Sequence, residues 1–107
     1  MNIIQTNIYN KEDLLELLKA YGERQKIVRI FGNADPALDF LDKCLVALNE
    51  SEKELIEQTC LHGVSMRQYA RETGYSRATI TRERDKILNM LVKFFSMYDK
   101  PGNEKTE

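Results

Sequence analysis

Residues 64–80 have the sequence VSMRQYARETGYSRATI, which contains the starts of two helices separated by one glycine. Ser65 followed by Gln68 has the pattern of a capping box, in which two side chains each bind a backbone N–H at a helix start. Ser76 supplies a second hydroxyl N-cap, and Gly74 lies just past the first helix, where a left-handed residue commonly ends one. Two short helices this close together predict a helix-turn-helix, which usually presents its second helix to a DNA groove.

Apolar residues beside these caps predict how the two helices pack. Val64 with Tyr69, and Tyr75 with Ile80, occupy the positions of hydrophobic staples. Ala70 lies near the middle of the first helix, where its small side chain would let the second helix approach with Ile80 facing inward.

A longer pattern surrounds this pair of helices. It comprises a leucine, an acidic helix with its glycine, a serine-capped helix with a central alanine, a glycine turn, and a serine followed by apolar residues. These positions are Leu48, 50–61, Gly63, Ser65, Ala70, Gly74, Ser76, Ile80, Ile87 and Leu91. In this region, which is less than half of the chain, the sequence resembles region 4 of sigma-70-type factors and the small phage transcription regulators of the ArpU type. Arg84 departs from the pattern, because an apolar residue is usual there, so either the packing differs or Arg84 extends its charged end to solvent.

The resemblance implies an all-α fold: a sigma region 4-like helix-turn-helix with additional N-terminal helices and a long C-terminal recognition helix. It implies a bacterial or phage transcription regulator that binds double-stranded DNA sequence-specifically. Because sigma region 4 domains touch both promoter and polymerase, RNA polymerase is a further expected partner. Residues 1–47 have no such match.

The expected DNA contacts lie on the helix that begins after Ser76. Side chains near the start of such a helix reach base edges, while caps and the first helix hold phosphates. Arg77 and Arg82 are expected to bind guanine, and the methyl groups of Ala78 and Thr81 to meet thymine. The candidates for phosphate contacts are Arg67, Ser76, Thr79 and Lys86.

The charge distribution favours this region as the DNA-binding part. Residues 65–93 carry seven basic and three acidic side chains, a balance of +4 that leaves −5 for the rest of a chain with net charge −1. Such an excess is typical of a phosphate-facing surface, although a solvated mixed-charge helix is the alternative. Asp85 would repel phosphate unless it orients Arg82 or Arg84.

The N-terminal half predicts further helices. Asn10 can cap a helix that begins at Lys11 and is interrupted or weakened near Gly22, and apolar residues continue a helical pattern to Gly32. A strand at 26–31 is the alternative, and residues 1–9 are expected to form an extended arm. An acidic cap before proline, Asp35-Pro36, predicts the next helix start.

Two more helices complete the prediction. Asn49 with Glu52 forms a capping pair for a helix that ends at Gly63, near which His62 is expected to cap carbonyls. The helix after Ser76 meets no proline or glycine before Pro101, so it could continue to Tyr98, a length of roughly 34 Å.

Residues 87–98 are apolar around most of the helix circumference, so they should be covered on more than one side. The N-terminal helices could provide all of this cover, or a second copy could share it in a homodimer built on residues 87–98 and those helices. We expect one helical domain over residues 1–98, divided into 1–47 and 48–98, and a disordered tail over 99–107.

Composition limits the other functions. The chain has 107 residues, 42% hydrophobic and 31% charged, with neither a membrane-spanning run nor a signal-peptide pattern, so a cytoplasmic location is expected. Cys44 and Cys60 fall in helical apolar patterns and should be reduced core residues. One histidine without metal-ligand spacing argues against zinc, and the absence of a catalytic pattern or phosphate loop argues against an enzyme or a bound cofactor.

Two further functions stay open. A protein–protein adaptor or anti-sigma-like factor would use the same fold on a protein partner, for which the acidic N-terminal half and apolar C-terminal helix are suited. A phage terminase small subunit would use it to recognise DNA as part of a ring-like oligomer.

Overall fold

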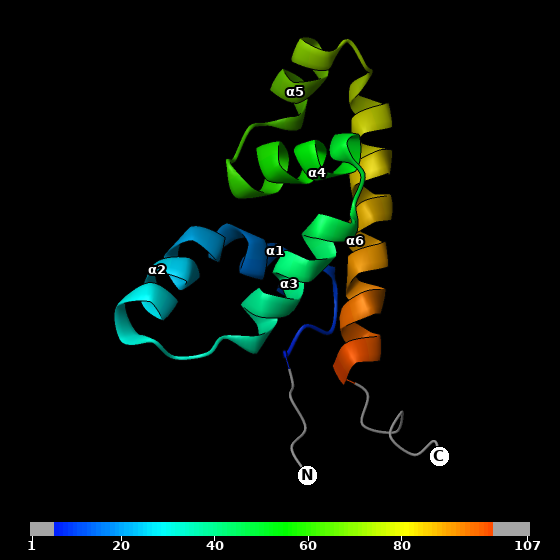
Figure 1. Cartoon of the computed structure of the whole chain (residues 1–107). Helices are drawn as coiled ribbons and strands as arrows, with labels where there is room; N and C mark the ends of the chain where they lie inside the picture. Colours follow the sequence, from blue (N-terminus) through cyan, green and yellow to red (C-terminus); the bar gives the residue numbers. More distant parts are fainter. Residues whose placement is uncertain (1–5, 100–107) are drawn as a thin grey trace.

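The computed structural model describes residues 6–99, and all regular secondary structure in that range is helical, which confirms the all-α prediction (Figure 1). The helices are α1 (Lys11–Lys19), α2 (Tyr21–Phe31), α3 (Pro36–Ala47), α4 (Glu50–Ile56), the π-helical turn η1 (Glu57–Leu61), α5 (Met66–Thr73) and α6 (Arg77–Asp99).

Helix α6 runs along one edge of the molecule and organises the rest (Figure 1). Helices α1, α3, α4 and α5 all pack against it. Helices α4 and α5 lie beside its N-terminal half, whereas α1 and α3 lie beside its C-terminal half (Figure 1). The first turns of α6 are therefore held by one set of helices and the last turns by another.

The predicted N-caps of the first helices are confirmed. The Asn10 side chain accepts a hydrogen bond from the Asp13 amide at 2.9 Å, and Asp35 accepts one from the Leu38 amide at 3.2 Å. Asn49 and Glu52 form a complete capping box, with side-chain to backbone distances of 2.8 and 3.1 Å. These caps satisfy N–H groups that a helix start leaves without an intrahelical partner.

The first helical segment breaks earlier than predicted. Ala20 ends α1 with φ −90° and ψ 5°, whereas Gly22 lies inside the first turn of α2. The alternative strand at 26–31 is wrong, because those residues continue α2 to Phe31. Since α2 buries none of its residues, helical spacing in its sequence did not correspond to a core-facing stripe.

The C-terminal half of α6 supplies the centre of the core. Ile87, Leu88, Leu91 and Phe95 are buried, and the Phe95 ring packs edge-on against Phe40 at a centroid distance of 4.8 Å. Other apolar residues of this half are covered only in part: Met90, Val92 and Phe94 are partly buried, Met97 is 56% exposed, and Tyr98 is 43% exposed with its ring stacked on Phe40 at 4.2 Å. The chain's own helices therefore cover much, but not all, of this apolar surface.

The residues that precede α1 also contribute to the fold. Thr6 and Ile8 are buried, so this part of the predicted extended arm packs onto the core. The predicted tail began at residue 99, but Asp99 is the last residue of α6; residues 1–5 and 100–107 lie outside the described range. Within residues 6–99, no helix combines the length and apolar character needed to cross a membrane.

Both cysteines are buried and unbonded, as predicted. Burial raises the pKa of the Cys44 thiol to about 11, because the thiolate would lose its hydration there. Cys44 therefore stays protonated near neutral pH and behaves as an apolar core residue.

A bidentate ion pair fixes the connection between α2 and α3. Arg24 donates from Nε and Nη2 to the two carboxylate oxygens of Asp35, both at 2.8 Å. Partial burial raises the pKa of the Asp35 carboxyl, but the hydrogen bonds from Arg24 and from the Leu38 amide outweigh burial and hold it below 3.8.

Asp35→Asn is expected to destabilise the protein in a pH-dependent way. Asparagine still caps a helix, so the change removes mainly the charge. Because the folded pKa is the lower one, the carboxylate stabilises the fold above the unfolded pKa of about 4, and this stabilisation disappears as pH falls through the folded value. Urea unfolding should show a clear deficit for the variant at pH 7 that shrinks toward pH 3. An equal deficit at both pH values would contradict this account.

Candidate nucleic-acid interface

A three-residue turn joins α5 to α6. Gly74 has φ +84°, a left-handed conformation that favours glycine, and its N–H donates to the Ala70 carbonyl at 2.9 Å. Ser76 then caps α6: its Oγ accepts from the Thr79 amide at 3.1 Å and donates to Thr79 Oγ1 at 2.9 Å. The turn thus ends one helix and starts the next with local hydrogen bonds.

The cap of α5 differs in part from the prediction. Ser65 Oγ accepts from the Gln68 amide at 3.1 Å, as expected. The Gln68 side chain does not return to the cap; its Nε2 donates to Glu72 at 3.1 Å, one turn along α5. In a capping box the Gln68 side-chain oxygen would accept from the Ser65 N–H. Here the Gln68 amide instead donates to a carboxylate at i+4, so only half of the capping box forms.

Small and apolar residues hold α5 against α6. Tyr69, Ala70 and Ile80 are all buried in the hydrophobic core, with exposures of 7%, 8% and 3%. Ile80 faces inward as predicted. Because Ile80 fixes the rotation of α6 about its axis, residues 78 and 82, both about 160° from it around the helix, must face outward.

The predicted contact residues fall into two groups. The first group is exposed: Ser76 at the cap of α6, Arg77, Ala78, Arg82 and Lys86 on α6, and Arg67 on α5. Thr79 and Thr81 are half-buried, and their hydroxyls are engaged within the protein, that of Thr79 with Ser76 and that of Thr81 with Met66 Sδ at 3.6 Å. The two threonines are therefore weaker candidates than the arginines.

Arg84, which sequence analysis expected either to pack differently or to extend to solvent, packs over the start of α5. It is half-buried, and its Nη1 lies 3.2 Å from Met66 Sδ. Its Nε is buried and has no hydrogen-bond partner among residues 6–99. The side chain thus bridges α6 and α5 and contacts a polarisable sulfur.

Asp85 has a partner that sequence analysis missed. Its Oδ1 lies 3.3 Å from Nζ of Lys11, the first residue of α1, instead of pairing with Arg82 or Arg84 as considered above. No local pattern could indicate this contact, because the two residues are 74 positions apart. Lys11 therefore joins the set of charged residues at the exposed face of α6.

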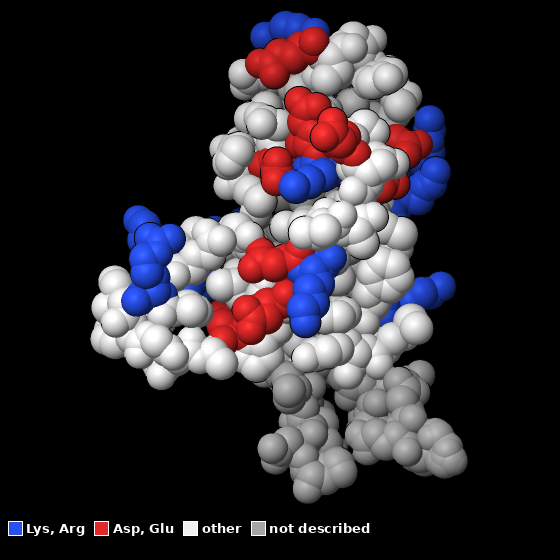
Figure 2. Space-filling model, in the orientation of Figure 1, with Lys and Arg blue, Asp and Glu red and all other residues white. Residues whose placement is uncertain are grey.

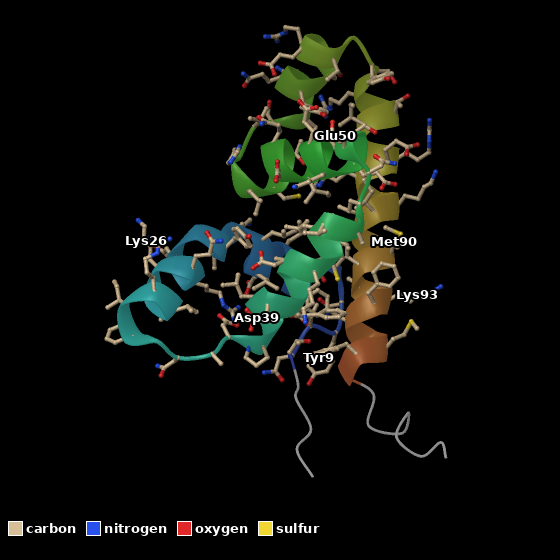
Figure 3. The ribbon with its side chains drawn as sticks, in the orientation of Figure 1. Tyr9, Lys26, Asp39, Glu50, Met90 and Lys93 are labelled. Atoms are coloured by element: carbon tan, nitrogen blue, oxygen red, sulfur yellow. The ribbon has the colours of Figure 1, made fainter. Side chains whose placement is uncertain are left out.

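Acidic side chains lie on the flank of α6 that faces α4. Figure 2 shows Asp and Glu gathered over α3 and α4 with Lys and Arg between them, and side chains of both signs along the edge formed by α6. Glu52 of α4 and Glu83 of α6 line the same hollow of about 320 Å³ beside Tyr75. In Figure 3, Glu50 lies at the start of α4 and Lys93 points away from α6 on the outer edge. The flank of α6 that faces α4 is thus unfavourable to phosphate. The outer face of α6, which carries Ala78 and Arg82, is the more favourable one.

Comparison with known proteins gives no relative from which a function could be inferred. No family model matches the chain, and no match is found among curated proteins or solved structures.

Proposed function

We propose that this chain is a sequence-specific, double-stranded DNA-binding transcription regulator of bacterial or phage type. The observation that carries the proposal is the exposure of Arg77, Ala78 and Arg82 on the first turns of α6, directly after a capped turn from α5. Arginine can donate two hydrogen bonds to the O6 and N7 of guanine, and the alanine methyl can contact thymine. In this arrangement α6 is the recognition helix and α5 the first helix of a helix-turn-helix.

The charge on each flank of α6 supports one direction of approach. DNA would meet the outer face of α6 with Arg67 on one side, while Glu52 and Glu83 point into the hollow on the α4 side. Lys86 lies 3.7 Å from Glu83 and lines a hollow with Glu52 and Glu83, so it lies on the α4 side and is a weaker phosphate candidate than Arg67. Arg67 thus supplies a phosphate contact, and Arg77 and Arg82 supply the base contacts.

The affinity of one copy should be low, because the whole chain has net charge −1 and offers few cationic contacts. Binding of two copies to two half-sites, or tethering to RNA polymerase, would raise the effective affinity. A homodimer through the N-terminal helices and residues 87–98 would cover partly exposed apolar residues at the end of α6, which include Met97 at 56% and Tyr98 at 43%. These functions place the protein in the cytoplasm.

A protein–protein adaptor is the second candidate. The apolar side chains exposed on α2 favour it, because large exposed apolar groups on one helix are typical of a protein-contact surface. DNA binding and such a contact are compatible, since α2 lies on the side of the molecule away from α6 (Figure 1).

Selection from a random pool of DNA duplexes tests the proposal. The expected result is enrichment of one short motif, with affinity that falls steeply as salt rises, because bound phosphates release counterions. A solution mass measured in parallel separates a dimer from a terminase-like ring. Failure to enrich any motif, together with no salt-dependent binding, would overturn DNA recognition and leave the adaptor.

A further inference from the structure

An ion pair joins the N-terminal helices to the exposed face of α6. Lys11 Nζ lies 3.3 Å from Asp85 Oδ1, with the two side chains 39% and 45% exposed. Asp85 lies about two turns into α6 and less than one turn after Arg82, a candidate base-contacting residue. A negative charge therefore lies close to the surface that the proposed function assigns to DNA.

The fold, rather than a flexible loop, brings Lys11 to this position. Helix α1 packs on α6 through a buried apolar face that includes Leu14, Leu17 and Leu18. The Asn10 cap fixes the start of α1, so Lys11 occupies the first helical position with its backbone already ordered. Only the two side chains, and not the backbone, lose freedom when the ion pair forms.

An unpaired carboxylate at position 85 would oppose DNA binding. A phosphate bound by neighbouring residues would lie within a Debye length of Asp85, about 8–10 Å at ordinary ionic strength, so salt would screen their repulsion only in part. A cation at 3.3 Å offsets most of this field at the distance of a phosphate.

We propose that Lys11 is a positioning residue for DNA binding: it neutralises and holds Asp85, so that the affinity of α6 depends on a lysine outside the helix-turn-helix. This inference rests on the proposed DNA-binding function. Lys11 acts through Asp85 and makes no base contact. The N-terminal helices are thereby coupled electrostatically to the recognition surface.

A double-mutant cycle with the duplex selected by the wild-type protein tests this inference. Lys11→Met keeps the length of the aliphatic side chain and is expected to weaken binding roughly two- to fivefold, the range for exposed charge pairs. Adding Asp85→Asn should restore affinity to the wild-type value. The matched control is Lys19→Met, which removes the same charge from the other end of α1, about 12 Å away, and should change affinity less than Lys11→Met. Thermal unfolding of each variant checks that the fold is retained.

Each outcome has a distinct meaning. Loss with Lys11→Met and recovery in the double variant support the coupling. A double variant as weak as Lys11→Met, or a Lys11→Met protein that binds like wild type, would overturn it while leaving DNA recognition intact. Absence of binding by the wild-type protein to any duplex would instead overturn the proposed function.

Discussion

Replacing Arg82 with alanine is expected to weaken binding of the selected duplex roughly 5- to 150-fold, equivalent to about 1–3 kcal/mol, and to relax sequence preference at one base pair. The Arg82 side chain is exposed on the outer face of α6, and the Ile80 side chain that sets the rotation of this helix is buried. Arg77→Ala should have an effect of the same size at a different base pair. Fluorescence anisotropy with the selected duplex and its single-base variants measures both quantities.

Arg29→Ala is the matched control for these two changes. It removes the same charge from an exposed position on α2, away from α6. Its effect should be small, uniform across DNA sequences and explained by the loss of one long-range charge. If Arg77→Ala and Arg82→Ala behave like Arg29→Ala, α6 does not make the base contacts.

Phe95→Ala is expected to lower the free energy of unfolding by about 3–5 kcal/mol, because it leaves a cavity in the centre of the core. Phe95 is fully buried, and its ring packs against Phe40 between α3 and α6. For a domain whose total stability is typically about 5–15 kcal/mol, this loss is large enough to bring part of the population to the unfolded state. Urea denaturation followed by circular dichroism measures the change.

Val46→Ala provides the comparison for Phe95. Val46 is apolar and helical but 78% exposed, so its truncation should change stability by less than about 0.5 kcal/mol. A small effect of Phe95→Ala, similar to that of Val46→Ala, would mean that the C-terminal half of α6 is not held by the helices that cover it here.

Features set by a few neighbouring residues were predictable from sequence. Asn10, Asp35, Asn49 and Ser76 cap helices through hydrogen bonds that span three residues, so a short pattern contains the whole interaction. The same holds for Gly74, whose role depends on its own backbone conformation. The exposure of Arg82 followed from the inward direction of Ile80. That of Arg77 followed from its place directly after the Ser76 cap.

Features that depend on distant partners were not predictable. The contacts of Lys11 with Asp85 and of Arg84 with Met66 join different helices, and no periodicity indicates them. The Gln68 side chain could accept a hydrogen bond from the Ser65 N–H or donate one to Glu72, and it donates to Glu72. The π-helical turn Glu57–Leu61 also went unpredicted. Within it the Thr59 hydroxyl donates to the Leu55 carbonyl at 2.7 Å, and the backbone N–H groups of His62 and Val64 donate to the carbonyls of Glu57 and Gln58.

Two predictions changed meaning once neighbouring helices were known. The apolar residues of α2 have helical spacing, yet Ile30 and Phe31 face solvent because α2 extends beyond the helices it could have packed on. His62 was expected to cap carbonyls, and it is its backbone N–H that binds the Glu57 carbonyl, while the side chain is exposed. In both cases the helical element was predicted correctly, and the neighbouring helices determined where the side chains lie.

Amide chemical-shift mapping of the wild-type protein with its selected duplex tests most directly whether the first turns of α6 bind DNA. The account predicts that the largest changes occur at residues 76–86, with smaller ones near Arg67 at the start of α5 and near Lys11. Changes concentrated on α2 and α3, with residues 76–86 unaffected, would contradict it.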